Sequence, residues 1–128
     1  MKSLSTGSLF AFFAVILGAF GAHALKETLT ELGTTETWKT AVLYHFIHSL
    51  ALFAFGLWSS SRSSCSCLHR AICWSWSLGI LFFSGSLYAL ALGGPGFLGP
   101  ITPIGGVFFL IGWALVFRLS LKTEATPS

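Results

Sequence analysis

The sequence predicts an all-α membrane protein, a bundle of four transmembrane helices in a single membrane domain, residues 1–128. Hydrophobic residues make up 54% of the chain and charged residues only 9%, whereas soluble domains carry about 25% charged residues. A surface with so little charge must face lipid, and the aromatic share of 16% suits helices anchored at the membrane interface. Four apolar stretches also approach the roughly 20 residues that a helix needs to cross a bilayer.

The first stretch, residues 4–25, is expected to be a retained helix. Lys2 before an apolar run and the sequence Ala-His-Ala at residues 22–24 also match a signal peptide with its cleavage site. However, the run is of spanning length, longer than the usual apolar core of a signal peptide. Small residues spaced four apart on one face are useful only in a retained helix: Ala14, Gly18 and Ala22.

The second stretch, residues 38–58, has a Trp at each end, as an interfacial aromatic belt would have it. Residues 26–37 before it carry both signs of charge. A short amphipathic helix at the interface, ended by Gly33, is therefore expected in this connection. The leucines on its apolar face are Leu25, Leu29 and Leu32.

The third and fourth stretches, residues 71–92 and 103–121, differ in what precedes them. Residues 59–70 are rich in Ser and predict a flexible solvated linker. The uncharged, Gly- and Pro-rich residues 93–103 argue against a regular helix. Thr102 is expected to cap the last helix, with Pro103 at its first position.

Small residues predict where these last two helices pack closely. Lipid offers no hydrophobic drive between helices, so close backbone approach must hold the bundle together. The third stretch repeats the spacing of four seen in the first, and the fourth carries further glycines. The residues expected to pack are Gly85, Ala89 and Gly93 in the third stretch, and Gly105, Gly106 and Gly112 in the fourth.

The charges predict the orientation. With four spans, both termini and residues 59–70 lie on one side, which holds five Lys or Arg against two on the other. The five are Lys2, Arg62, Arg70, Arg118 and Lys122, and the two are Lys26 and Lys39. The excess favours both termini in the cytoplasm of a bacterial plasma membrane, with the opposite orientation as the alternative.

The composition also restricts the chemistry. The chain has no Asp, Asn or Gln, and its carboxylates, Glu27, Glu31, Glu36 and Glu124, all lie outside the apolar stretches. Paired carboxylates for acid/base catalysis and a carboxylate proton relay within the membrane are therefore excluded. We expect no enzyme and no cofactor. The net charge of +3 is too modest for a nucleic-acid partner, which leaves the lipid bilayer, a second copy or another membrane protein.

Histidines supply the polar groups within the spans. His45 and His48 lie three apart on one helical face, and His48 is about 15 Å from Trp38 along the helix, near the midplane. Either these groups line a site, such as a hydrated cavity, ligand pocket or metal site, or they join helices by hydrogen bonds. The candidate polar cluster comprises His23, Tyr44, His45, His48, Ser84, Ser86, Tyr88 and Thr102.

Two groups of residues contain metal-ligand types, and neither is expected to bind a metal. His45 and His48 would need His23 as a third ligand. Cys65, Cys67, His69 and Cys73 offer ligands that zinc accepts, but their spacing does not match the common structural zinc sites. Reduced cytoplasmic thiols are the expected state of these cysteines.

The motifs resemble family 423 of the domains of unknown function. GAFGAHAL at 18–25, WKTAVLYHFIHSLALF at 38–53, FSGSLYALALGG at 83–94 and LGPITPIGG at 98–106 carry the resemblance. It implies a small polytopic membrane protein and brings no established activity or catalytic residue. Its signature positions favour convergence of His23, His48 and Tyr88. They are Gly21, His23, Trp38, Tyr44, His48, Ser84, Gly85, Tyr88, Thr102, Pro103, Gly105 and Gly106.

Two functions remain open after these observations. The dominance of packing signals favours a non-enzymatic interaction or envelope-associated subunit. The alternative is a small transporter or channel-like component, in which the intramembrane polar cluster beside the broken segment at 93–103 lines a pathway.

Overall fold

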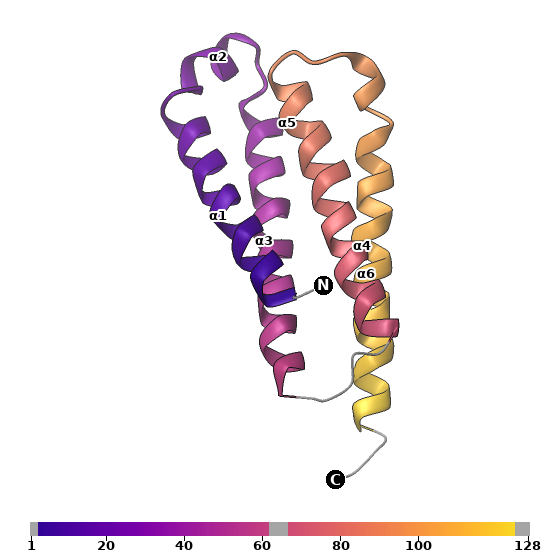
Figure 1. The fold of residues 1–128 in the computed structure, drawn as a ribbon. Coiled ribbons are helices and arrows are strands. Elements are labelled where there is room, and N and C mark those ends of the chain that lie inside the picture. The colour runs from indigo at the N-terminus through magenta and orange to yellow at the C-terminus, as the bar shows by residue number, and fades with distance from the viewer. Residues whose placement is uncertain (1–2, 62–66, 125–128) are drawn as a thin grey trace.

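The computed structural model describes residues 3–61 and 67–124, and within these ranges all regular structure is helical. Four of the described helices are long and apolar enough to cross a membrane, namely Ser3–Ala22, Thr35–Ser60, Cys67–Ala91 and Gly96–Glu124. The predicted all-α class with four spans is confirmed. The chain runs up and down, so that α1 and α4 begin in the lower half of the bundle, where α3 and α6 end (Figure 1).

The first two spans are α1 (Ser3–Ala22) and α3 (Thr35–Ser60), joined through the short helix α2 (Lys26–Glu31). α1 ends three residues earlier than expected, where the Leu25 amide donates to the Phe20 carbonyl at 2.8 Å. The short helix predicted in this connection is present, and Gly33 ends it with a φ of 66°. Of the three leucines on its expected apolar face, Leu29 is buried whereas Leu32 is exposed.

The third span is one continuous path of α4 (Cys67–Gly79), a π-helical turn η1 (Ile80–Ser84) and α5 (Gly85–Ala91). It begins four residues before the expected start. In η1 the Gly85 amide donates to the Ile80 carbonyl, which adds one residue to a normal helical turn. This extra residue changes which faces of α4 and α5 align along the span. No periodicity in the sequence predicts the π turn.

The fourth span is α6 (Ile101–Glu124), preceded by a 3₁₀ turn η2 (Gly96–Leu98). The expected cap role of Thr102 is wrong, because α6 already begins at Ile101. Pro103 is accommodated in the first turn, where a missing N–H costs no helical hydrogen bond. Since the Thr102 hydroxyl is not needed as a cap, it contacts the Ser86 hydroxyl of the third span at 2.6 Å.

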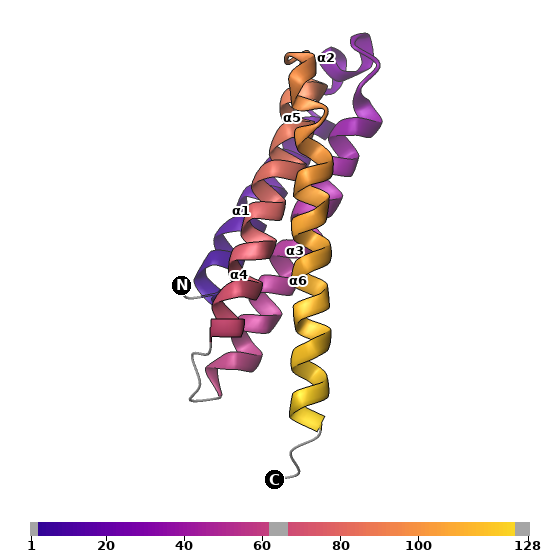
Figure 2. The same ribbon diagram turned by 90° about the vertical axis from the view of Figure 1, so that its right-hand side faces the viewer.

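Each span packs against the next along the chain. α1 lies on α3, α3 lies on η1 and α5, and α4 and η1 lie on α6. α3 and the third span are consequently the most buried, and α1 and α6 are the least. In both views α1 begins above the lower ends of α3 and α6 (Figures 1 and 2).

Glycines mark the closest helix crossings. A Cβ on Gly7 of α1 would lie 2.5 Å from the Phe53 nitrogen of α3, and one on Gly56 of α3 would overlap the Leu4 backbone. A Cβ on Gly105 of α6 would overlap the Phe83 backbone of η1. Backbone therefore lies directly on backbone at these crossings, as expected for Gly105.

The predicted packing stripe in the third span is wrong. No described heavy atom lies within 4 Å of a Cβ added to Gly85 or to Gly93. Gly85 is exposed because the π turn before it directs this face of α5 away from the neighbouring spans. In the first span, Ala14 is buried as expected whereas Ala22 is exposed.

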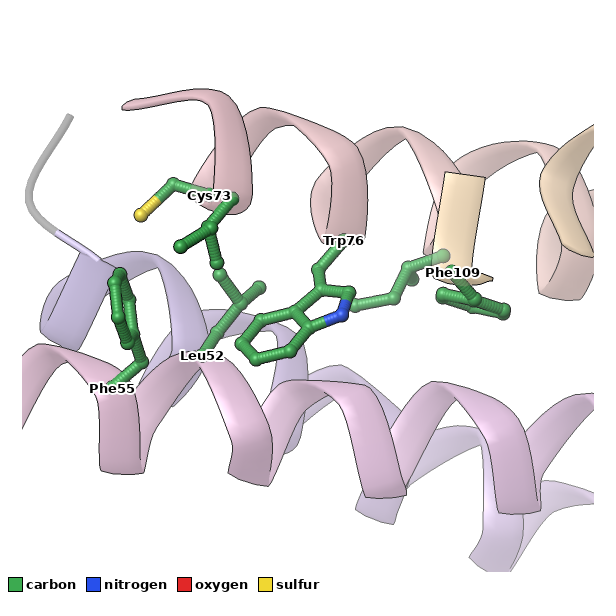
Figure 3. Packing of buried hydrophobic residues seen from close by; sticks show 7 residues of the cluster. Leu52, Phe55, Cys73, Trp76 and Phe109 are labelled. Atoms are coloured by element: carbon green, nitrogen blue, oxygen red, sulfur yellow. The ribbon is translucent and has the colours of Figure 1, made fainter. Parts of the chain in front are cut away.

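The lower half of the bundle holds the main apolar core. Figure 3 shows Leu52 and Phe55 of α3 facing Cys73 and Trp76 of α4, with Phe109 of α6 beside them. All of these side chains are at most 8% exposed. The Trp76 indole covers Gly112, where a Cβ would collide with the ring. The expected packing role of Gly112 is therefore confirmed, with an indole rather than a backbone as its neighbour.

We predict that Gly105→Ala lowers the free energy of unfolding by about 1–3 kcal/mol, because its methyl group must force α6 away from η1. The matched control is Gly85→Ala, which adds the same methyl group in open space and is expected to be neutral or slightly stabilising. Unfolding of each variant by SDS in detergent micelles, followed by circular dichroism, measures the difference. Equal stability of the two variants would contradict the crossing at Gly105.

Candidate functional site

His48 lies in the middle of α3, and both of its ring nitrogens are engaged. Nδ1 lies 2.8 Å from the Tyr44 carbonyl, and Nε2 lies 3.1 Å from the Trp113 indole nitrogen of α6. A carbonyl only accepts and an indole N–H only donates. The proton of a neutral imidazole must therefore be on Nδ1, and Nε2 is the acceptor for Trp113. The ring is 4% exposed and stacks on Phe109 at 3.5 Å between centroids.

His45 lies one turn before His48 and faces a different neighbour. Its Nδ1 lies 3.1 Å from the Tyr88 hydroxyl of α5. Among the described residues, its Nε2 has no hydrogen-bond partner. The edge of the ring packs against Phe10 of α1 at 5.9 Å, and the backbone of Phe10 faces the imidazole. His45 thus lies where α1, α3 and α5 meet.

Two serines of the third span face its neighbours. The Ser86 hydroxyl contacts the Thr102 hydroxyl of α6 at 2.6 Å and donates to the Phe83 carbonyl at 3.0 Å. Because Ser86 has a single hydroxyl proton, which it gives to Phe83, the Thr102 hydroxyl is the donor to Ser86. Ser84, the last residue of η1, is fully buried, and its hydroxyl has no partner in the described part of the chain.

The remaining two candidates lie apart from these pairs. Tyr44 is 39% exposed, and its ring packs on Phe83 at 4.5 Å, while its carbonyl accepts from His48. His23 is exposed in the turn after α1, beside residues 26–31 of the α2 segment. The expected convergence of His23, His48 and Tyr88 does not occur. α1 ends before His23, and Tyr88 meets His45 instead.

Two further polar contacts that join the helices were not expected from the sequence. The Trp38 indole is 4% exposed and donates to the Leu17 carbonyl of α1 at 3.0 Å, so it is not an interfacial belt residue. The ring reaches this carbonyl across Gly21, where a Cβ would collide with it. The Thr34 hydroxyl donates to the Ala91 carbonyl at 2.6 Å. Gly21 leaves room on α1 for a large ring such as that of Trp38. A glycine in one span and a tryptophan in the next were the sequence signal that could have indicated the bond from Trp38 to Leu17.

Within the described ranges, no group of three or more His, Cys, Asp or Glu residues could hold a metal ion. Cys65 of the considered cysteine site lies outside the described residues. Cys67 is exposed, whereas Cys73 is buried in the apolar core. The His69 ring packs on Phe55 at 4.7 Å between centroids.

The polar side chains therefore form pairs between helices in the upper half of the bundle rather than one cavity. Such pairs fix the rotation and height of one span relative to another. The fold and these pairs define an integral membrane protein with four spans joined by interior hydrogen bonds.

The chain belongs to the family described as protein of unknown function (DUF423), whose model matches residues 17–106. A UPF0382 membrane protein of Staphylococcus epidermidis is 44% identical over 119 residues, covering 91% of this chain and 92% of the relative. The UPF0382 membrane protein YwdK of Bacillus subtilis is 39% identical over 116 residues, covering 91% and 93%. The UPF0382 inner membrane protein YgdD of Escherichia coli is similar over 88% of this chain. No solved structure matches the chain.

We predict that Trp113 and His48 are energetically coupled. Trp113→Phe leaves the buried Nε2 of His48 without a donor, and His48→Phe keeps a ring on Phe109 but removes the acceptor. In a double-mutant cycle the interaction energy should be about 0.6 kcal/mol and at most about 1.7 kcal/mol, as for other membrane hydrogen bonds.

SDS unfolding of the wild type, both single variants and the double variant measures this interaction energy. A matched control cycle combines His48→Phe with Phe117→Leu. Phe117 lies on α6, like Trp113, but is 66% exposed, so this cycle should give no interaction energy. Additive effects of His48→Phe and Trp113→Phe would show that the hydrogen bond does not form in the membrane.

Proposed function

We propose that this chain is a non-enzymatic subunit of the bacterial plasma membrane that binds a transmembrane helix of a partner through the exposed face of α5. One observation carries this proposal. Gly85 is exposed with no described heavy atom within 4 Å of an added Cβ. Ala89, one turn further along α5, is half-exposed, so small residues let a second helix backbone approach this face closely. The small residues on this face are not used to pack the chain itself, whereas Gly7, Gly56 and Gly105 are.

The state of the polar groups supports a role in assembly rather than catalysis. His48 has both nitrogens bonded within the bundle, and His45, Tyr88, Ser86 and Thr102 are paired between spans. A general base or nucleophile needs an accessible lone pair near a substrate. The same pairing gives no support to a transport pathway through a single copy, because the midplane histidine is closed off by Phe109 and Trp113.

The orientation within the membrane is part of the proposal. α3 and α6 end in the lower half of the bundle and α4 begins there (Figure 1), and Arg70, Arg118 and Lys122 belong to this side. The upper end carries Lys26 and Lys39, and Lys39 is paired with Glu36 at 2.8 Å. The positive-inside rule therefore favours the lower end in the cytoplasm.

We predict that Gly85→Leu abolishes most partner binding while the monomer stays folded. The larger side chain keeps the backbone of a second helix away from α5. It contacts no other part of the same chain, since the space around Gly85 is open. Cells carrying two differently tagged copies are solubilised in mild detergent, and co-purifying proteins are identified by mass spectrometry. Recovery of the second tag identifies another copy as the partner, and a different membrane protein recovered without the second tag identifies that protein as the partner.

The control for this experiment is Ala114→Leu, which enlarges an exposed residue on α6 and should leave the association unchanged. Recovery of the wild type as a lone monomer under every gentle condition would contradict the proposed function. Equal association of Gly85→Leu and the wild type would contradict the role of the α5 face.

We predict that a fluorescent reporter fused after Ser128 is active and that an alkaline phosphatase fused there is inactive, because the first folds in the cytoplasm and the second folds outside it. Fusions truncated after Leu98, between the third and fourth spans, should give the opposite pattern. The reverse result for both pairs of fusions would place the termini outside the cytoplasm.

A further inference from the structure

An apolar groove lies in the lower half of the bundle, between α3 and α6. Its volume is about 470 Å³ and its walls include Ala51, Ala54 and Phe55 of α3, Trp76 of α4, and Trp113 and Val116 of α6. The groove has room because Ala51 and Ala54 of α3 place only methyl groups between the larger rings of Phe55, Trp76 and Trp113. The hydrogen bond from Trp113 to His48 closes its upper end.

From this groove we infer that the protein binds one phospholipid, with one acyl chain between α3 and α6 and the headgroup at the lower end of α6. The groove is flanked by residues exposed on the membrane-facing surface, including Leu57 and Phe117, so hydrocarbon is the medium around it. A helix is about 10 Å wide and fills roughly 1,200 Å³ over ten residues. The groove is too small for a helix of a partner or of a second copy, whereas a single hydrocarbon chain suits its size and apolar walls.

The lower mouth of the groove is polar and indicates the headgroup. Ser120, Thr123 and Glu124 line it. The Ser120 and Thr123 hydroxyls donate to carbonyls of their own helix, so their oxygens remain free to accept. A carboxylate with two accepting hydroxyls complements a primary ammonium group. This chemistry is that of an ethanolamine headgroup, whereas a glycerol headgroup has no ammonium group for Glu124 to bind.

The test uses the full chain in mild detergent with phosphatidylethanolamine that carries a photoreactive group on one acyl chain. After irradiation and digestion, labels are expected mainly on residues 51–58 and 113–120. Ala54→Trp should lower this labelling roughly tenfold, because an indole on the exposed rim fills the groove and removes the packing contacts of the acyl chain with the protein. Ala114→Trp adds the same indole on the lipid-facing side of α6 and should leave the labelling unchanged.

A second comparison tests the headgroup and does not depend on a groove substitution. A phosphatidylglycerol probe with the same acyl chain should label these segments more weakly than the ethanolamine probe, and Glu124→Gln should remove this preference. Labels spread evenly over all exposed faces, or equal labelling of Ala54→Trp and the wild type, would overturn the lipid site. Equal labelling by both probes in the wild type would overturn the ethanolamine assignment. None of these results depends on whether the α5 face binds a partner.

Discussion

Close approach of helix backbones is the constraint on which the rest of this structure depends. Lipid is as apolar as the side chains of a span, so burial of apolar surface does not hold helices together as it does in water. Glycines replace that driving force by allowing van der Waals contact along the backbone, at Gly7 and Gly56 between α1 and α3 and at Gly105 between α6 and η1. Because α6 lies so close to η1, the short hydroxyl side chains of Ser86 and Thr102 can meet at 2.6 Å.

The interhelical hydrogen bonds add specificity more than stability. Five such contacts have been described, and at about 0.6 kcal/mol each they contribute roughly 3 kcal/mol in all. Each contact also fixes the rotation of one helix on another, because its partners meet at only one register. His48 fixes the register of α6 on α3, and the bond from Nδ1 to the Tyr44 carbonyl within α3 keeps Nε2 free to accept from Trp113.

The sequence was sufficient to predict the spans and insufficient to predict their contacts. Length and hydropathy determine that four helices cross the membrane, and these properties are local. Which face of a helix meets which neighbour depends on features that are not local. Gly85 and Gly105 look equivalent in sequence, yet the π turn at Ile80–Ser84 turns Gly85 outward while Gly105 meets that same turn.

The candidate polar site shows the same limit. Its histidines were found from their position within the spans, and the interpretation as hydrogen bonds between helices describes His45 and His48 well. Their partners could not be predicted, because Trp113 and Tyr88 are brought to them by the tilt of other spans. His23 was included because its place in the sequence is near the end of a span, and only the early end of α1 separates it from the others.

The two halves of the bundle differ in a way that follows from where the polar groups lie. Above His48, hydrogen bonds join neighbouring spans and Gly105 lets α6 lie on η1, so the register of the spans is defined there. Below His48, the described contacts between α3 and α6 are apolar, and small side chains leave a groove between them. Apolar contacts allow many registers, so an occupant that fills the groove would restrict how α6 lies on α3. The position of α6 on α3 in the lower half therefore depends on what fills the groove, whereas α1 is held on α3 there by close contacts at Gly7 and Gly56.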